Sequence, residues 1–83
     1  MKNIIAISPC VKIKKLKSSY LFSFHFKGSY KGHLIKELEV YSSELLELNE
    51  EYVLFINVIE VRNKKIKGIL LSYKKLSQVE FSL

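Results

Sequence analysis

Lysine is the most abundant residue in this sequence with a side chain that can bind a charged ligand or take part in catalysis. Residues 1–36 contain eight Lys and no acidic residue, residues 37–60 contain seven Glu and no Lys or Arg, and residues 61–83 contain five Lys, one Arg and one Glu. These blocks carry formal charges of +8, −7 and +5, which give the total of +6. Such a division builds a strong local field and favours an anionic partner, although lysine-rich turns also serve solubility alone.

Residues suited to catalysis or metal binding are few. The sequence has no Asp, so neither an Asp-containing triad nor an Asp-based magnesium site can form within one chain. One Cys (Cys10) and two His (His25 and His33) fall short of the usual four-ligand zinc set, and no phosphate-cradling glycine motif occurs. We therefore expect a protein that is not an enzyme, with no cofactor or metal, in which Cys10 is a small apolar core residue.

Length and cysteine content indicate the class of protein. The 83 residues fit one domain, 1–83, and a chain this short buries only roughly 60–65% of its unfolded surface, so homodimerisation would help it. One cysteine excludes an intrachain disulfide, which in so small a domain favours a cytoplasmic protein. The apolar stretch Ile4–Ile7 is too short for a secretory leader, and no run is long enough for a membrane span.

The clearest strand pattern runs from residue 20 to residue 36. Apolar and polar residues alternate over Tyr20–Lys27, which places four aromatic residues on one face and predicts a strand whose aromatic face is core. The segment Lys27–Gly32 contains two glycines and is interpreted as a hairpin loop. In the next expected strand, His33–Tyr41, Leu34 begins the apolar face and Lys36 breaks the alternation, which a bulge near Lys36 would repair.

The remaining elements follow from composition. Ser42–Glu51 is expected to form a short helix capped by Ser43. Tyr52–Val61 is apolar on both faces, which predicts a strand covered on both sides or placed at a subunit interface. Three further strands are expected, at Ile4–Lys17, at Ile66–Tyr73 and, as a C-terminal extra strand, at Val79–Leu83.

This order resembles the OB-fold over residues 4–75. The resemblance is carried by YLFSFHFKGSYKG, by the acidic connector SSELLELNEE and by the closing segment EYVLFINVIEVRNKKIKGILL. It implies an all-β protein, a five-stranded OB-like barrel with a short helix between strands 3 and 4 and a C-terminal extra strand. An SH3-like or Sm-like small barrel is the competing architecture. Small bacterial single-strand nucleic-acid-binding proteins share the OB order.

The resemblance also implies a binding surface, because OB-folds bind oligonucleotides on the face of strands 2 and 3 and on the loops joining strands 1–2 and 4–5. Both loops are basic here, whereas the acidic connector is expected elsewhere on the barrel. We therefore expect a non-catalytic module for single-stranded DNA or RNA, with low sequence specificity because one Arg is present and lysines contact phosphates as point charges. The expected nucleic-acid-binding residues are Lys14, Lys15, Lys17, His25, Lys27, Tyr30, Lys31, Arg62, Lys64, Lys65 and Lys67, with His33 and Tyr41 as further base-contact candidates.

A second function fits the same sequence. The two-sided apolar strand Tyr52–Val61 and the alternating tail Val79–Leu83 would suit a protein-interaction or oligomerisation module. The two functions are compatible, since a homodimer could also bind nucleic acid.

Overall fold

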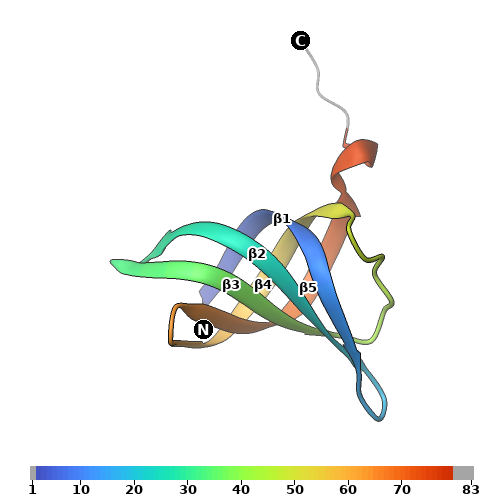
Figure 1. Cartoon of the computed structure of the whole chain (residues 1–83), viewed down its shortest axis with the longest axis horizontal. Helices are drawn as coiled ribbons and strands as arrows, with labels where there is room; N and C mark the ends of the chain where they lie inside the picture. The colour runs from blue at the N-terminus through green and yellow to red at the C-terminus, as the bar shows by residue number, and fades with distance from the viewer. Residues whose placement is uncertain (1, 80–83) are drawn as a thin grey trace.

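The chain forms five long β-strands joined by short connections (Figure 1). The structure, a computed structural model, describes residues 2–79. Its strands are β1 (Lys2–Lys15), β2 (Tyr20–Tyr30), β3 (His33–Ser42), β4 (Glu51–Arg62) and β5 (Lys65–Lys75), followed by a short 3-10 helix, η1 (Leu76–Gln78). The expectation of an all-β protein is confirmed.

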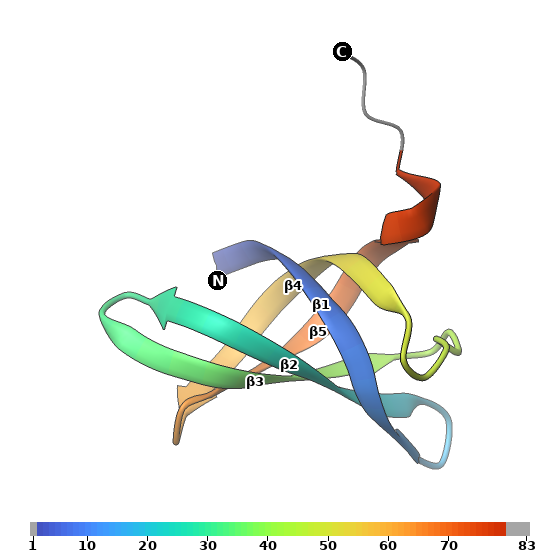
Figure 2. The ribbon, with the colours of Figure 1, turned by 45° about the horizontal axis from the view of Figure 1, so that its top comes forward.

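The five strands make one sheet that closes into a ring in the order β1-β2-β3-β5-β4, with β4 pairing back onto β1. The pairing of β3 with β5 is parallel, and the other four strand pairings of the ring are antiparallel. Strand β1 pairs with two strands: its first part, Lys2–Pro9, pairs with β4, and its second part, from Cys10 onward, pairs with β2. The bend between these halves, where β1 turns across the ring, is visible in Figure 2.

Apolar side chains at alternating positions of the strands point into the ring and form the core. Phe22 and Phe24 are fully buried, and Tyr20 and Phe26 pack against the same cluster, so the aromatic face of β2 is core as predicted. Cys10 is also fully buried. Opposite them β4 contributes the buried residues Tyr52, Leu54 and Ile56, and the other core residues are Ala6, Ile35, Leu38, Val40, Leu46 and Ile66.

The irregularity expected near Lys36 lies on the partner strand. The register passes from His25↔Glu37 to Gly28↔Ile35, so β2 has one residue more than β3 at this point. The bulge coincides with a change of phase in β3, where Ile35 and Leu38 are both buried, whereas the alternation of β2 continues through it. It also turns Ile35 into the core and leaves Leu34 55% exposed, so the placement of Leu34 on the apolar face was wrong.

No helix forms between β3 and β4, which corrects the short helix predicted for Ser42–Glu51. The Ser42 hydroxyl accepts a hydrogen bond from the Glu44 N–H, and this local bond competes with helix formation. The Glu47 N–H donates to the Tyr52 hydroxyl at 2.7 Å, and the Asn49 N–H donates to the Cys10 carbonyl at 2.7 Å. The connector is therefore held as an irregular segment, and it buries Leu46 without a helix.

Two tight turns connect the long hairpins. Lys31 and Gly32 have φ values of 50° and 83° between β2 and β3, and Asn63 and Lys64 have φ values of 53° and 62° between β4 and β5. Two successive residues with positive φ match the twist of antiparallel strands. As a result β2 extends to Tyr30, and the loop predicted for Lys27–Gly32 is reduced to its last two residues.

The C-terminal strand predicted for Val79–Leu83 lies, apart from Val79, outside the described residues. The described chain ends with η1 after β5. Within residues 2–79, no helix has the length and apolar character needed to cross a membrane.

Candidate nucleic-acid interface

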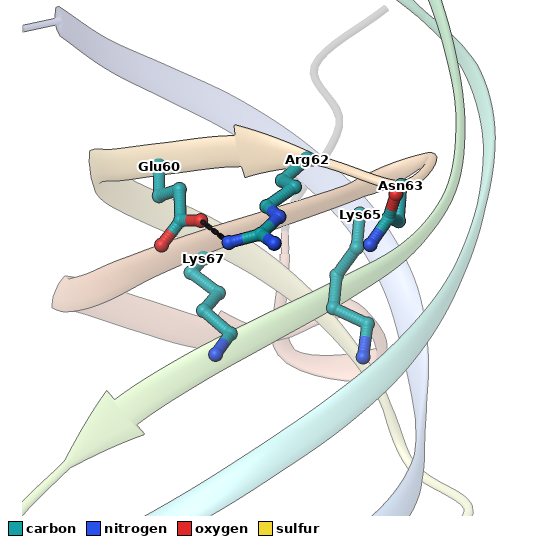
Figure 3. A pocket seen from close by; sticks show the side chains of 5 residues that line it. All are labelled: Glu60, Arg62, Asn63, Lys65 and Lys67. Atoms are coloured by element: carbon teal, nitrogen blue, oxygen red, sulfur yellow. Dashed lines mark ion pairs between the residues drawn. The ribbon is translucent and has the colours of Figure 1, made fainter.

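The β4–β5 hairpin carries a basic hollow on its outer surface (Figure 3). This hollow has a volume of about 260 Å³ and is lined by Glu60, Arg62, Asn63, Lys65 and Lys67. The strand register explains the grouping, because Arg62 lies opposite Lys65 and Glu60 lies opposite Lys67. The Arg62 guanidinium is 3.8 Å from the Glu60 carboxylate, and its side chain is 76% exposed. We call Arg62, Lys64, Lys65 and Lys67 the hairpin cations.

Two of the hairpin cations are paired with acids of β3. The Lys65 ammonium lies 3.2 Å from both the Glu37 and the Glu39 carboxylates, and Lys67 lies 4.0 Å from Glu39. Hydrogen bonds to Glu37 and then Glu39 raise the pKa of Lys65 above its ordinary value. Two glutamates of β3, which precede the acidic connector, therefore lie beside the basic turn, because the parallel β3–β5 pairing brings Glu37 opposite Lys65. Arg62 and Lys64 retain charge that is more available to a ligand.

The lysines of the β1–β2 connection lie at the other end of the β2–β3 ladder. Lys15 is opposite Tyr20, and Tyr20 is opposite Ser42 at the end of β3. Lys65 is opposite Glu37, which lies five residues before Ser42 in β3. At about 3.3 Å per residue, the lysines of the β1–β2 connection and the hairpin cations are therefore separated by roughly 17 Å along the strands. Figures 1 and 2 both show the β1–β2 connection far from the β4–β5 turn. We call Lys14, Lys15 and Lys17 the loop lysines.

Between the two basic groups the outer surface carries an aromatic and apolar row and, nearer the hairpin cations, the carboxylates of Glu37 and Glu39. The register aligns Leu21 of β2, Tyr41 of β3 and Ile69 of β5 in one row, with Lys14 at its β1 end. Leu21 and Tyr41 are partly exposed, and Ile69 is 48% exposed. A partly exposed tyrosine ring is a surface on which an unpaired base can stack. We call this row, with Glu37 and Glu39 beside it, the outer β2–β3 face.

The other predicted residues are divided between two places. His25 is exposed on β2 opposite Glu37, and Lys27 is exposed near it, where both line an apolar hollow of about 580 Å³. Tyr30 is the last residue of β2 and packs partly against the core, so it does not stand free at a loop tip. Lys31 follows it in the turn, with its ammonium 5.6 Å from the centre of the Tyr30 ring.

Sequence reasoning missed Lys2 as part of the basic surface. A hollow of about 290 Å³ brings Lys2 of β1 beside Tyr30, Lys31 and His33 of the β2–β3 hairpin, and it shares Glu60 with the hollow of the hairpin cations. The signal was indirect: Lys2 is opposite Val58, which places the start of β1 near the end of β4. That pairing becomes visible only once the ring is closed.

The described residues, 2–79, contain no cluster of three or more side chains that could hold a metal ion. Searches with protein-family models, among curated proteins and among solved structures found no match for this chain.

Proposed function

We propose that this chain is an OB-like module that binds single-stranded DNA or RNA on its outer β2–β3 face with low sequence specificity. The observation that carries the proposal is the spatial order β4-β1-β2-β3, which is a Greek key, closed by β5 in parallel with β3. In a five-stranded Greek-key barrel of the OB type, this face and the loops joining strands 1–2 and 4–5 bind oligonucleotides.

Charge and side-chain chemistry support the same surface. The loop lysines and the hairpin cations stand at the two ends of the outer β2–β3 face, with Tyr41 between them. Phosphates of a strand laid across the face would contact both basic groups, while a base stacks on Tyr41. Lysines predominate over the single arginine, Arg62, so base-edge recognition contributes little and affinity depends mainly on phosphate charge.

The direct test is a fluorescence titration of labelled oligo-dT and oligo-U with the protein at several salt concentrations. If about four phosphates are neutralised, log K should fall with log salt at a slope of about −3. Similar affinities for the two homopolymers are expected because few base edges are read. Undetectable binding at low salt, or binding that salt leaves unchanged, would refute the proposal.

A second candidate function is self-association through the outer side of β1, β4 and β5. Strand β4 buries one side and leaves the other open: Phe55 is 38% exposed and lies opposite Ile5, which is 67% exposed. We call these two residues, with Ile7, Ile69 and Leu71, each about half exposed on the same three strands, the apolar patch; exposed apolar patches mark interaction sites. An apolar outer face of a sheet can pack on a second copy of itself, and the added burial suits a chain of 83 residues.

Sedimentation tests this second function. The substitution Ile5→Glu should reduce the fraction of dimer, because it places a charge in the middle of the apolar patch. Leu34→Glu is the matched control, since Leu34 is 55% exposed on the β2–β3 hairpin, away from the patch. A chain ending at Lys75, the end of β5, tests whether the tail takes part. A wild-type chain that stays monomeric at high concentration would refute self-association.

A further inference from the structure

The hollow between the start of β1 and the β2–β3 turn contains basic residues whose charge is not neutralised within the fold. Lys2, Tyr30, Lys31 and His33 line it, and Val58, Ile59, Glu60 and Val61 of β4 form the remaining wall. None of the ion pairs found among residues 2–79 involves Lys2 or Lys31. Glu60, the acid at the edge of the hollow, is paired with Arg62.

The two lysines line the same hollow, Lys2 from the start of β1 and Lys31 from the β2–β3 turn. A side-chain hydrogen bond with Lys2 lowers the pKa of Lys31, with smaller contributions from desolvation and from the Lys2 charge. The turn holds Lys31 at a positive φ of 50°, and its ammonium stays 5.6 Å from the centre of the Tyr30 ring. Two ammonium groups held on adjacent elements in this way form an anion site, because a bound anion relieves their repulsion.

We propose that this hollow binds a phosphate monoester, and specifically the terminal phosphate of a nucleic-acid strand. A phosphate monoester carries a charge of about −1.5 to −2 at neutral pH and three acceptor oxygens, which match two ammonium groups and an imidazole better than a singly charged phosphodiester does. The hollow shares Glu60 with that of the hairpin cations, so a strand on the outer β2–β3 face could end here. The assignment to a strand end rests on the proposed function.

The test compares oligo-dT bearing a 5′-phosphate, a 3′-phosphate or only hydroxyl ends at constant ionic strength. One phosphorylated form should bind the wild-type protein roughly fivefold more tightly than the hydroxyl form, as expected for contacts with two exposed ammonium groups. Lys31→Asn keeps a residue that tolerates positive φ, and Lys2→Gln keeps the side-chain length; each should bring the ratio of phosphate-ended to hydroxyl-ended affinity close to one. Lys15→Gln is the control that should preserve the ratio.

A second measurement separates this inference from the proposed function. Inorganic phosphate, titrated against chloride at constant ionic strength, should shift the amide signals of Tyr30, Lys31 and His33 in a nitrogen–proton correlation spectrum. These shifts without oligonucleotide binding would keep the phosphate site and remove the nucleic-acid strand. Oligonucleotide binding with equal affinity for all three ends, or an absence of shifts, would overturn the phosphate site.

Discussion

The charge of Lys65, a lysine of the basic turn, is paired with acids in the fold rather than free for a ligand. In the sequence it belongs to a run of cations, but in the structure its ammonium is 3.2 Å from both Glu37 and Glu39. Its charge therefore holds β5 against β3 across the parallel pairing, where two glutamates would otherwise repel each other. Arg62 and Lys64, by contrast, have exposed positions on the turn and are better placed for phosphate contacts.

This difference predicts that Lys65→Gln lowers the urea midpoint of unfolding at low salt more than Lys15→Gln does. Removing Lys65 leaves two like charges two residues apart on one strand, whereas Lys15 forms none of the ion pairs described in residues 2–79. The gap should shrink at about 1 M salt, where charges are screened beyond about 3 Å. Equal midpoints at low salt would show that the Lys65 pairs do not stabilise the fold.

At the scale of single elements, β5 can approach β4 closely because residue 68 is glycine. A Cβ on Gly68 would lie 2.6 Å from the Asn57 carbonyl oxygen and would also clash with the Ile56 side chain. Gly32, in the β2–β3 turn, has open space around its Cβ position but a positive φ of 83°. The first glycine is required by packing and the second by backbone conformation.

We predict that Gly68→Ala costs about 2–3 kcal/mol of unfolding free energy, because the backbone oxygen of Asn57 cannot move aside without disturbing the β4–β5 ladder. Gly32→Ala should cost about 1 kcal/mol, the strain of a non-glycine residue in the left-handed region. Urea denaturation of the two variants measures both values. A Gly68→Ala cost no larger than that of Gly32→Ala would contradict the close approach.

Some elements could be predicted from sequence and others could not, for identifiable reasons. The core face of β2 follows from strict alternation between Tyr20 and Lys27, which depends only on local sequence. The connector before β4 was misjudged because Leu46 is buried without a helix, held by bonds to Tyr52 and Cys10 that lie outside the segment. Likewise, the register that buries Ile35 and exposes Leu34 depends on a bulge in the neighbouring strand.

At the scale of the whole molecule, a core that includes titratable groups sets the pH range of stability. Burial raises the pKa of the Cys10 thiol above its ordinary value of 9.0, and burial is also the main cause that raises the pKa of Tyr52 above 10.0. Both groups are neutral when protonated, so the folded state holds its protons more tightly than the unfolded state does. Their contribution to stability is complete below pH 9 and is lost as the pH rises through the raised folded values.

The urea midpoint should therefore fall as the pH rises from about 9 to about 11. Pairing with Glu37 and Glu39 raises the pKa of Lys65, and pairing with Glu47 raises that of Lys75, which acts in the same direction. Cys10→Ala removes one titrating group and should make the fall shallower, although the smaller side chain lowers stability at neutral pH. An unchanged pH profile in Cys10→Ala would remove the thiol from this account.

The arrangement of the proposed binding face is also a property of the whole molecule. The loop lysines and the hairpin cations could be identified from the sequence, because both are runs of basic residues near expected turns. Their separation along β3, the acids beside Lys65 and the approach of Lys2 could not, since all three depend on which strands close the ring. The sequence thus predicts the basic residues of the proposed face, whereas their arrangement follows only from the order of the strands.

The proposal that the outer β2–β3 face binds a nucleic-acid strand is tested most directly by measuring the affinity of three charge-reversal variants for oligo-dT. Arg62→Glu and Lys15→Glu alter the two basic ends of the outer β2–β3 face, and Lys74→Glu makes the same charge change on β5 beyond its pairing with β3. Arg62→Glu and Lys15→Glu should each weaken binding several-fold and make the slope of log K against log salt shallower by about 0.7–1. Lys74→Glu should have little effect on either quantity. Equal losses in all three variants would mean that net charge alone, and not this face, binds the strand.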